Sequence, residues 1–135
     1  MIGEGDKAPA LTVEASDGSK INLAAPGQPL VLYFYPKDDT SGCTREAQDF
    51  TALASEFEKA GVKVVGVSRD PIKSHEKFIG KYSLAVPLAS DADGRISEAF
   101  GTIYLEGSLG HLMPYIIFVL IMLFRPQGLT WSSSR

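Results

Sequence analysis

Two apolar runs, residues 30–35 and 62–67, dominate the hydrophobic pattern of the chain. Both are rich in β-branched or aromatic side chains and neither alternates regularly with polar positions, which is typical of strands buried on both faces of a sheet. Between them, apolar residues recur at helical spacing and predict one helix over residues 42–60, closed by Gly61. The order of strand, helix and strand predicts a right-handed crossover between parallel strands, and therefore an α/β domain.

The flanking segments complete the expected domain as far as residue 101. We predict a hairpin over 11–13 and 20–23, a helix with Asp70 as its N-cap, Pro71 as its first residue and Tyr82 near its end, a strand over 84–88 and a short helix over 93–100. Because proline lacks the backbone N–H that a sheet needs, Pro87 places the last of these strands near an edge.

Composition narrows the classes of function. The 135 residues suffice for one domain with a substantial core. Lysine and arginine number 13 and aspartate and glutamate 16, so the net charge is -3 and no basic stripe predicts a nucleic-acid partner. The amino-terminal residues lack the pattern of a secretory signal, which predicts a cytoplasmic location. One cysteine and two histidines predict neither an internal disulfide nor a zinc site of the Cys/His type.

The single cysteine, Cys43, is expected in the first turn of the helix over 42–60. Backbone N–H groups without intrahelical partners point towards that position, and the helix dipole favours an anion there. Lowering a thiol pKa from about 8.5 to about 6 requires about 3.4 kcal/mol, of which a helix end supplies about 0.3–2 kcal/mol. A neighbouring hydroxyl or cation must supply the rest, and Thr40 and Arg45 are the nearest candidates.

Structural roles for these residues stay open at this point. The alternative for Cys43 is a small buried apolar residue, and the alternative for Thr40 is a helix cap. His75 is expected on a solvated helix face and His111 in the apolar C-terminal segment, so neither is favoured as an acid–base group.

The segment around Cys43, residues 34–47 (FYPKDDTSGCTREA), is followed by 65–70 (VGVSRD), 74–78 (SHEKF) and 88–91 (LASD). Together these segments resemble the peroxiredoxins, and most closely the bacterioferritin-comigratory-protein or Prx Q group, from residue 3 to about 102. The resemblance implies a thioredoxin-like fold. It also implies reduction of hydrogen peroxide and organic hydroperoxides, with no metal or organic cofactor.

By this resemblance Cys43 is the peroxidatic cysteine, whose thiolate attacks a peroxide oxygen and becomes a sulfenic acid. Thr40 matches the threonine that hydrogen-bonds the peroxide, and Pro36 matches the proline that shields the pocket. Ser41 stands where the family usually has proline. Gln48 stands where many members of the group carry a resolving cysteine, so a one-cysteine mechanism with an external thiol reductant such as thioredoxin is expected.

After Gly101 the sequence departs from the family. The family's Arg-Ser/Thr-Phe strand, whose arginine stabilises the thiolate and the peroxide, is not recognisable there, so we expect a fold that is incomplete at the C-terminal side of the sheet, and an impaired activity. Instead, residues 110–129 (GHLMPYIIFVLIMLFRPQGL) resemble the C-terminal end of branched-chain amino-acid ABC transporter permeases. We therefore divide the chain into a truncated peroxiredoxin-like domain, residues 1–102, and a foreign hydrophobic tail, residues 103–135.

The apolar run from Leu112 to Phe124 leaves two interpretations. It is shorter than the about 20 residues of a membrane-spanning helix, but it could contact a membrane. Alternatively, residues 115–124 fill the vacant place in the sheet as a strand. The main hypothesis is therefore a thiol peroxidase that is a monomer or a weak dimer. The competing hypothesis is a non-catalytic chimaeric remnant that binds membranes or aggregates through this run.

Overall fold

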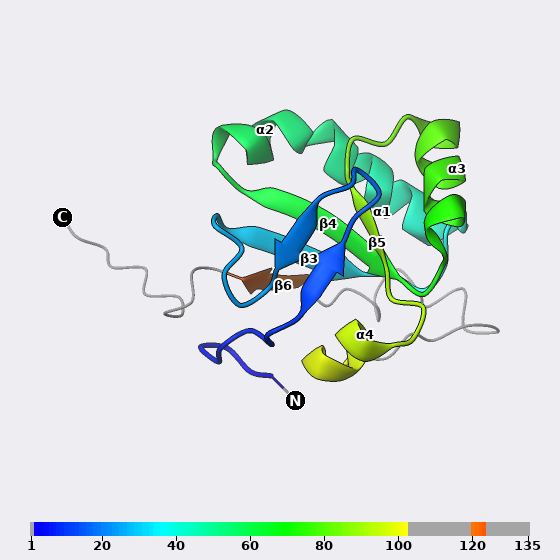
Figure 1. The fold of residues 1–135 in the computed structure, drawn as a ribbon. Coiled ribbons are helices and arrows are strands. Elements are labelled where there is room, and N and C mark those ends of the chain that lie inside the picture. The colour runs from blue at the N-terminus through cyan, green and yellow to red at the C-terminus, as the bar shows by residue number, and fades with distance from the viewer. Residues whose placement is uncertain (1, 103–119, 124–135) are drawn as a thin grey trace.

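The computed structural model describes residues 2–102 and 120–123, which form a sheet with helices on both faces (Figure 1). The sheet has the strand order β5-β4-β3-β6. Its strands are β3 (Leu30–Phe34), β4 (Lys63–Ser68), β5 (Leu88–Ser90) and β6 (Leu120–Leu123). Strands β3, β4 and β5 are parallel and β6 runs antiparallel to β3. The predicted parallel crossover between the two apolar runs is confirmed.

The side chains of β3 alternate between two separate cores, which explains why its sequence is apolar at every position. Leu30, Leu32 and Phe34 belong to one core. Val31 and Tyr33, with Tyr35 just after the strand, belong to the other. All six are at most 2% exposed. A strand between two covered faces must bury both sets of side chains, as the apolar run predicted.

Different elements cover the two faces. The first core lies against the hairpin of β1 (Thr12–Glu14) and β2 (Lys20–Asn22) and against α4 (Arg95–Phe100). The second core lies against α1 (Ser41–Ala52) and α3 (Ile72–Tyr82). In Figure 1, α1 and α3 lie above the sheet and α4 below it. The helix that carries Cys43 therefore packs on the face formed by Val31, Tyr33 and Tyr35.

The single helix predicted over 42–60 is wrong, because the chain forms two helices there. Helix α1 ends at Ala52 and α2 spans Ala54–Lys59, with Leu53 between them at φ -97° and ψ 4°. The hydroxyl of Thr51 donates to the carbonyl of Ala47 at 2.8 Å. Such a bond to the carbonyl four residues earlier weakens and bends a helix, and the break follows two residues later.

Two other predicted boundaries are wrong, one by one residue and one by four, both at prolines. Pro71 is the N-cap rather than the first residue of α3, because the Asp70 carboxylate that was expected to cap the helix accepts bonds from Ser68 and from the Asp38 backbone instead. Strand β5 begins at Leu88 rather than at residue 84, after Pro87, whose carbonyl accepts from the Gly66 N–H at 3.0 Å. Proline has no N–H with which to extend that ladder.

The C-terminal segment enters the sheet. Strand β6 pairs with β3 in a register that places Leu120 opposite Tyr33 and Leu123 opposite Leu30. The interpretation of this run as a strand is thereby confirmed for these four residues. The rest of the run from Leu112 to Phe124, and His111, lie outside the described residues. No helix in the described part of the chain is long and apolar enough to span a membrane. The division of the chain at about residue 102 stays a prediction.

Candidate active site

Cys43 is the third residue of α1 and lies in its first turn, as predicted. Thr40 is the N-cap residue, with an extended backbone at φ -92° and ψ 156°, and its carbonyl accepts from the Thr44 N–H at 2.8 Å. Cys43 is only 7% exposed and belongs to the same core as Ala47 and Phe50 on the inner face of α1. The sulfur therefore lies at a helix start and also inside the core.

The Thr40 side chain does not cap α1, so the capping alternative is wrong. Its hydroxyl donates to the carbonyl of Lys37 at 3.1 Å and lies close enough to the sulfur of Cys43 to lower the pKa of the thiol. The loop between β3 and α1, residues 36–40, thus folds back on itself and places a hydroxyl beside the sulfur. Pro36, at the start of this loop, is buried; its shielding role stays a prediction.

The thiol pKa of Cys43 is raised rather than lowered. Burial is the largest cause and raises it, because the interior disfavours the thiolate. Hydrogen bonds from Thr40 and from the Lys37 backbone act in the opposite direction and lower the pKa, but they do not outweigh burial. The negative charges of Glu46 and Asp38 raise it further. The helix start and the two neighbouring hydrogen-bonding groups therefore do not together produce the lowered thiol pKa that sequence reasoning expected.

Arg45 does not compensate for the burial that raises the thiol pKa of Cys43. It is exposed, whereas Cys43, two residues earlier, faces the core. No cation of the described residues contributes to lowering the Cys43 pKa. Of the two candidates that the sequence offered for stabilising the thiolate, Arg45 therefore does not serve, and Thr40 is the one that lowers the thiol pKa.

Glu46 is a site residue that sequence reasoning missed. Burial, and to a lesser degree the charge of Asp49, raise the pKa of its carboxyl from 4.5 to about 7. Its Oε1 atom is buried and has no hydrogen-bond partner among the described residues. Its position three residues after Cys43, one turn along α1, is the signal that could have revealed it.

The prediction of a solvated His75 is wrong, because the ring is fully buried. Its Nδ1 lies 2.8 Å from Oδ2 of Asp38, and its Nε2 lies 3.0 Å from the carbonyl oxygen of Ala89. The Tyr35 hydroxyl donates to Oδ1 of the same aspartate at 2.6 Å. The period of α3 alone could not reveal this burial, since the aspartate lies 37 residues away in the sequence.

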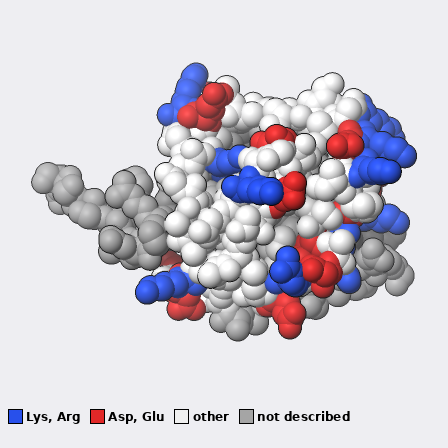
Figure 2. Space-filling view, viewed as in Figure 1, with Lys and Arg blue, Asp and Glu red and all other residues white. Residues whose placement is uncertain are grey.

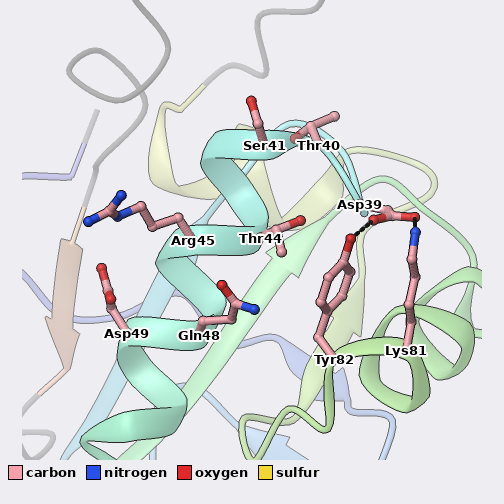
Figure 3. A pocket seen from close by; sticks show the side chains of 9 residues that line it. All are labelled: Asp39, Thr40, Ser41, Thr44, Arg45, Gln48, Asp49, Lys81 and Tyr82. Carbon is pink, nitrogen blue, oxygen red and sulfur yellow. Dashed lines mark hydrogen bonds and ion pairs between the residues drawn. The ribbon is translucent and has the colours of Figure 1, made fainter.

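An open groove of about 620 Å³ flanks the start of α1 (Figure 3). Asp39 lies on one side, where its carboxylate accepts from Lys81 at 2.7 Å and from the Tyr82 hydroxyl at 2.6 Å. Figure 3 shows Arg45 pointing away from this cluster. Gln48 also lines the groove, so the position of the family's resolving cysteine faces solvent rather than Cys43.

Charges of both signs are interspersed over the face shown in Figure 2. In the described part of the chain, no group of three or more His, Cys, Asp or Glu side chains is arranged to hold a metal ion.

Comparison with known proteins decides the family. The AhpC/TSA family model matches residues 4–119. The chain belongs to this family. Peroxiredoxin Bcp of Xanthomonas campestris is 51% identical over 101 residues, which are 74% of this chain and 63% of that protein. The putative peroxiredoxin bcp of Coxiella burnetii is 42% identical over 110 residues, or 81% of this chain and 73% of that protein.

Solved structures of Bcp and Prx Q proteins have the same fold. The bacterioferritin comigratory protein of Xanthomonas campestris, studied for its alkyl peroxide reduction activity, superposes with a TM-score of 0.72 at 39% identity, covering 93% of this chain and 83% of that one. PrxQ of Xylella fastidiosa gives a TM-score of 0.77 at 31% identity, covering 95% and 82%. The thioredoxin-like peroxiredoxin fold and the resemblance to the Bcp and Prx Q group are confirmed.

Proposed function

We propose that this AhpC/TSA-family chain is a thiol-dependent peroxidase of the one-cysteine type, with Cys43 as its nucleophile. The observation that carries the proposal is the arrangement at the helix start, where the chain's single cysteine lies in the first turn of α1, directly after the loop that ends at Thr40. The Thr40 side chain and the Lys37 backbone each lower the pKa of the thiol and so favour the thiolate, which is the reactive form. Similarity to proteins named peroxiredoxin supports this assignment.

In the first half-reaction the Cys43 thiolate attacks one oxygen of a hydroperoxide. A sulfur–oxygen bond forms while the oxygen–oxygen bond breaks, and the leaving alkoxide or hydroxide takes up a proton and departs as an alcohol or as water. The sulfur is oxidised by two electrons to the sulfenic acid and the peroxide is reduced by two. The role of Thr40 is to hold the peroxide through its hydroxyl, and the role of Pro36 is to shield the pocket.

The second half-reaction needs a thiol from outside the chain. A reductant thiol attacks the sulfenic sulfur, water leaves and a mixed disulfide forms; a second reductant thiol then releases Cys43 as the thiol. Dithiol reductants of the thioredoxin type supply both thiols in one molecule. Gln48, in place of a cysteine, leaves the chain without a second thiol of its own.

Hydrogen peroxide and organic hydroperoxides are the proposed substrates, in line with the alkyl peroxide reduction studied in the Xanthomonas protein.

A cytoplasmic location and a monomeric or weakly dimeric state belong to the same proposal. Sedimentation of the purified chain over a range of concentrations tests the oligomeric state.

Peroxide consumption with an added dithiol tests the activity. The native chain should consume hydrogen peroxide above background, and Cys43→Ser should not. Gln48→Ala, on the exposed face of α1, is the matched control and should retain the native rate. Trapping of the sulfenic acid with dimedone after one equivalent of peroxide should label the native chain at Cys43. Equal consumption by the native chain and Cys43→Ser would contradict the proposal.

A further inference from the structure

The loop that carries Lys37 and Thr40 is held against α3 through two consecutive aspartates. Asp38 is buried at 8% exposure and contacts the N-terminal part of α3. Asp39 is exposed and contacts Lys81 and Tyr82 at the other end of the same helix. Asp39 has a positive φ of 58°, and the two carboxylates reach opposite ends of α3.

Of the two aspartates, the buried Asp38 makes more hydrogen-bond contacts and is the stronger anchor of the loop. Its carboxylate accepts from the Tyr35 hydroxyl at 2.6 Å and from the Ser74 hydroxyl at 2.7 Å, and it contacts Nδ1 of His75 at 2.8 Å. Its own backbone N–H donates to Asp70 at 2.9 Å. Four groups from the end of β3, from α3 and from the turn before α3 thus hold one loop residue.

The His75 ring holds the Asp38 carboxylate in one orientation, because both of its nitrogen atoms have partners. The Ala89 carbonyl can only accept, so Nε2 carries a proton, and a second proton must lie between Nδ1 and the Asp38 carboxylate for that contact to be attractive. The ring is therefore tied to β5 on one side and to the loop on the other. A buried pair held in this way keeps a single geometry, because each partner left alone would be unsatisfied.

Residues on either side of Asp38 connect this loop to the helix start that carries Cys43. Lys37 immediately precedes it and Thr40 follows two residues later. The Thr40 hydroxyl donates to the Lys37 carbonyl at 3.1 Å, and Thr40 is the N-cap residue of α1, whose first turn carries Cys43. No atom of His75 needs to touch the sulfur or a peroxide for this to matter. A shift of the loop would therefore move the start of α1 and the surroundings of the sulfur together, since the Thr40 hydrogen bond within the loop weakens steeply with misalignment.

We propose that Asp38 and His75 are positioning residues, which hold the loop over residues 36–40 against α3, fix the start of α1 beside the Cys43 sulfur and so set the reactivity of the thiol. The consequence for peroxide reduction rests on the proposed function. The consequence for the thiol does not, because alkylation of Cys43 can be measured without any peroxide or turnover.

The experiment measures the rate of Cys43 alkylation by iodoacetamide from pH 6 to 10 in the full chain. His75→Gln and Asp38→Asn should each shift the profile to higher pH and lower the rate at neutral pH by about 10-fold or more, since hydrogen bonds to a charged group carry effects of this size. Ser74→Ala removes one of the donors to Asp38 from a half-buried position of α3 and should give a smaller shift in the same direction.

Ile96→Ala is the matched control for lost stability. Ile96 is buried in the core on the opposite face of the sheet, and its truncation should lower the unfolding midpoint while leaving the alkylation profile of the folded chain unchanged. Parent-like profiles for folded His75→Gln and Asp38→Asn would overturn the proposal. If those two variants do not fold, a parent-like profile for Ser74→Ala overturns it. A shifted profile in variants of a parent chain that consumes no peroxide would leave the positioning role standing and refute the peroxidase assignment alone.

Discussion

Gly66 lies opposite Tyr33 in the parallel register of β4 and β3, and a Cβ atom on Gly66 would lie 2.6 Å from Cζ of the Tyr33 ring. That ring stacks on Phe50 of α1, with centroids 4.5 Å apart. The glycine thus makes room for the ring on which α1 packs. Because Cys43 lies on the same helix face as Phe50, the position of the cysteine depends on this close approach.

Gly66→Ala should destabilise the protein by about 1–3 kcal/mol, because the added methyl group meets two buried side chains that have little room to move, Tyr33 and Leu88. The midpoint of urea unfolding measures the change. Gly80→Ala is the control: it lies in α3, where an added methyl group would meet open space, and should stabilise the protein by about 0.5–1 kcal/mol. Equal midpoints for both variants would contradict the steric account.

Thr40→Val should slow the reaction of Cys43 with hydrogen peroxide by about 10–100-fold. The substitution keeps the side-chain shape but removes the hydroxyl, which lowers the pKa of the Cys43 thiol and is proposed to hold the peroxide; a hydrogen bond to a charged group contributes about 1.5–3 kcal/mol. Single-turnover oxidation followed by loss of free thiol measures the rate. Ser41→Ala changes the neighbouring exposed residue and should react at the parent rate. A parent-like rate for Thr40→Val would show that the hydroxyl does not serve the reaction.

The raised pKa of Glu46 predicts a specific pH dependence of stability. Between pH 4.5 and about 7 the folded chain holds a proton on Glu46 that the unfolded chain has lost. The contribution of Glu46 to the free energy of unfolding is therefore complete below pH 4.5 and decreases as the pH rises to about 7. Glu46→Gln should remove that slope, as measured by urea unfolding at several pH values. Glu76→Gln, on the exposed face of α3, should leave it in place. An unchanged slope in Glu46→Gln would assign the dependence to another group.

Ile121→Pro should remove the pairing of β6 with β3. Ile121 lies opposite Leu32 in the antiparallel register, and proline in the middle of a strand removes a ladder hydrogen bond. Hydrogen exchange of the β3 amides that face β6 should become faster, while the β3 amides that face β4 stay protected. Ile121→Val keeps the backbone N–H and should exchange like the parent. Unchanged protection in the proline variant would mean that β6 contributes little to the sheet.

Local pattern was enough to predict the framework of the site. The apolar run over 30–35 predicted a doubly buried strand, and the helical spacing after it placed Cys43 in the first turn of a helix. Both predictions depend on residues close in sequence, where strand and helix periods and glycine signals act directly. The family resemblance around Cys43 also lies within one continuous segment.

Long-range contacts determined what the pattern could not predict. His75 is on a helix that looks polar in sequence, yet it is buried because Asp38 and Ala89, 37 and 14 residues away, both face its ring. The thiol pKa of Cys43 is raised because packing against the sheet removes water from the sulfur, a loss that a helix start does not offset. Residues 120–123 form a strand because β3 presents an edge with which they can pair. Burial and pairing between distant segments depend on the assembled fold, and for that reason they determine the chemistry of a site that the sequence could only locate.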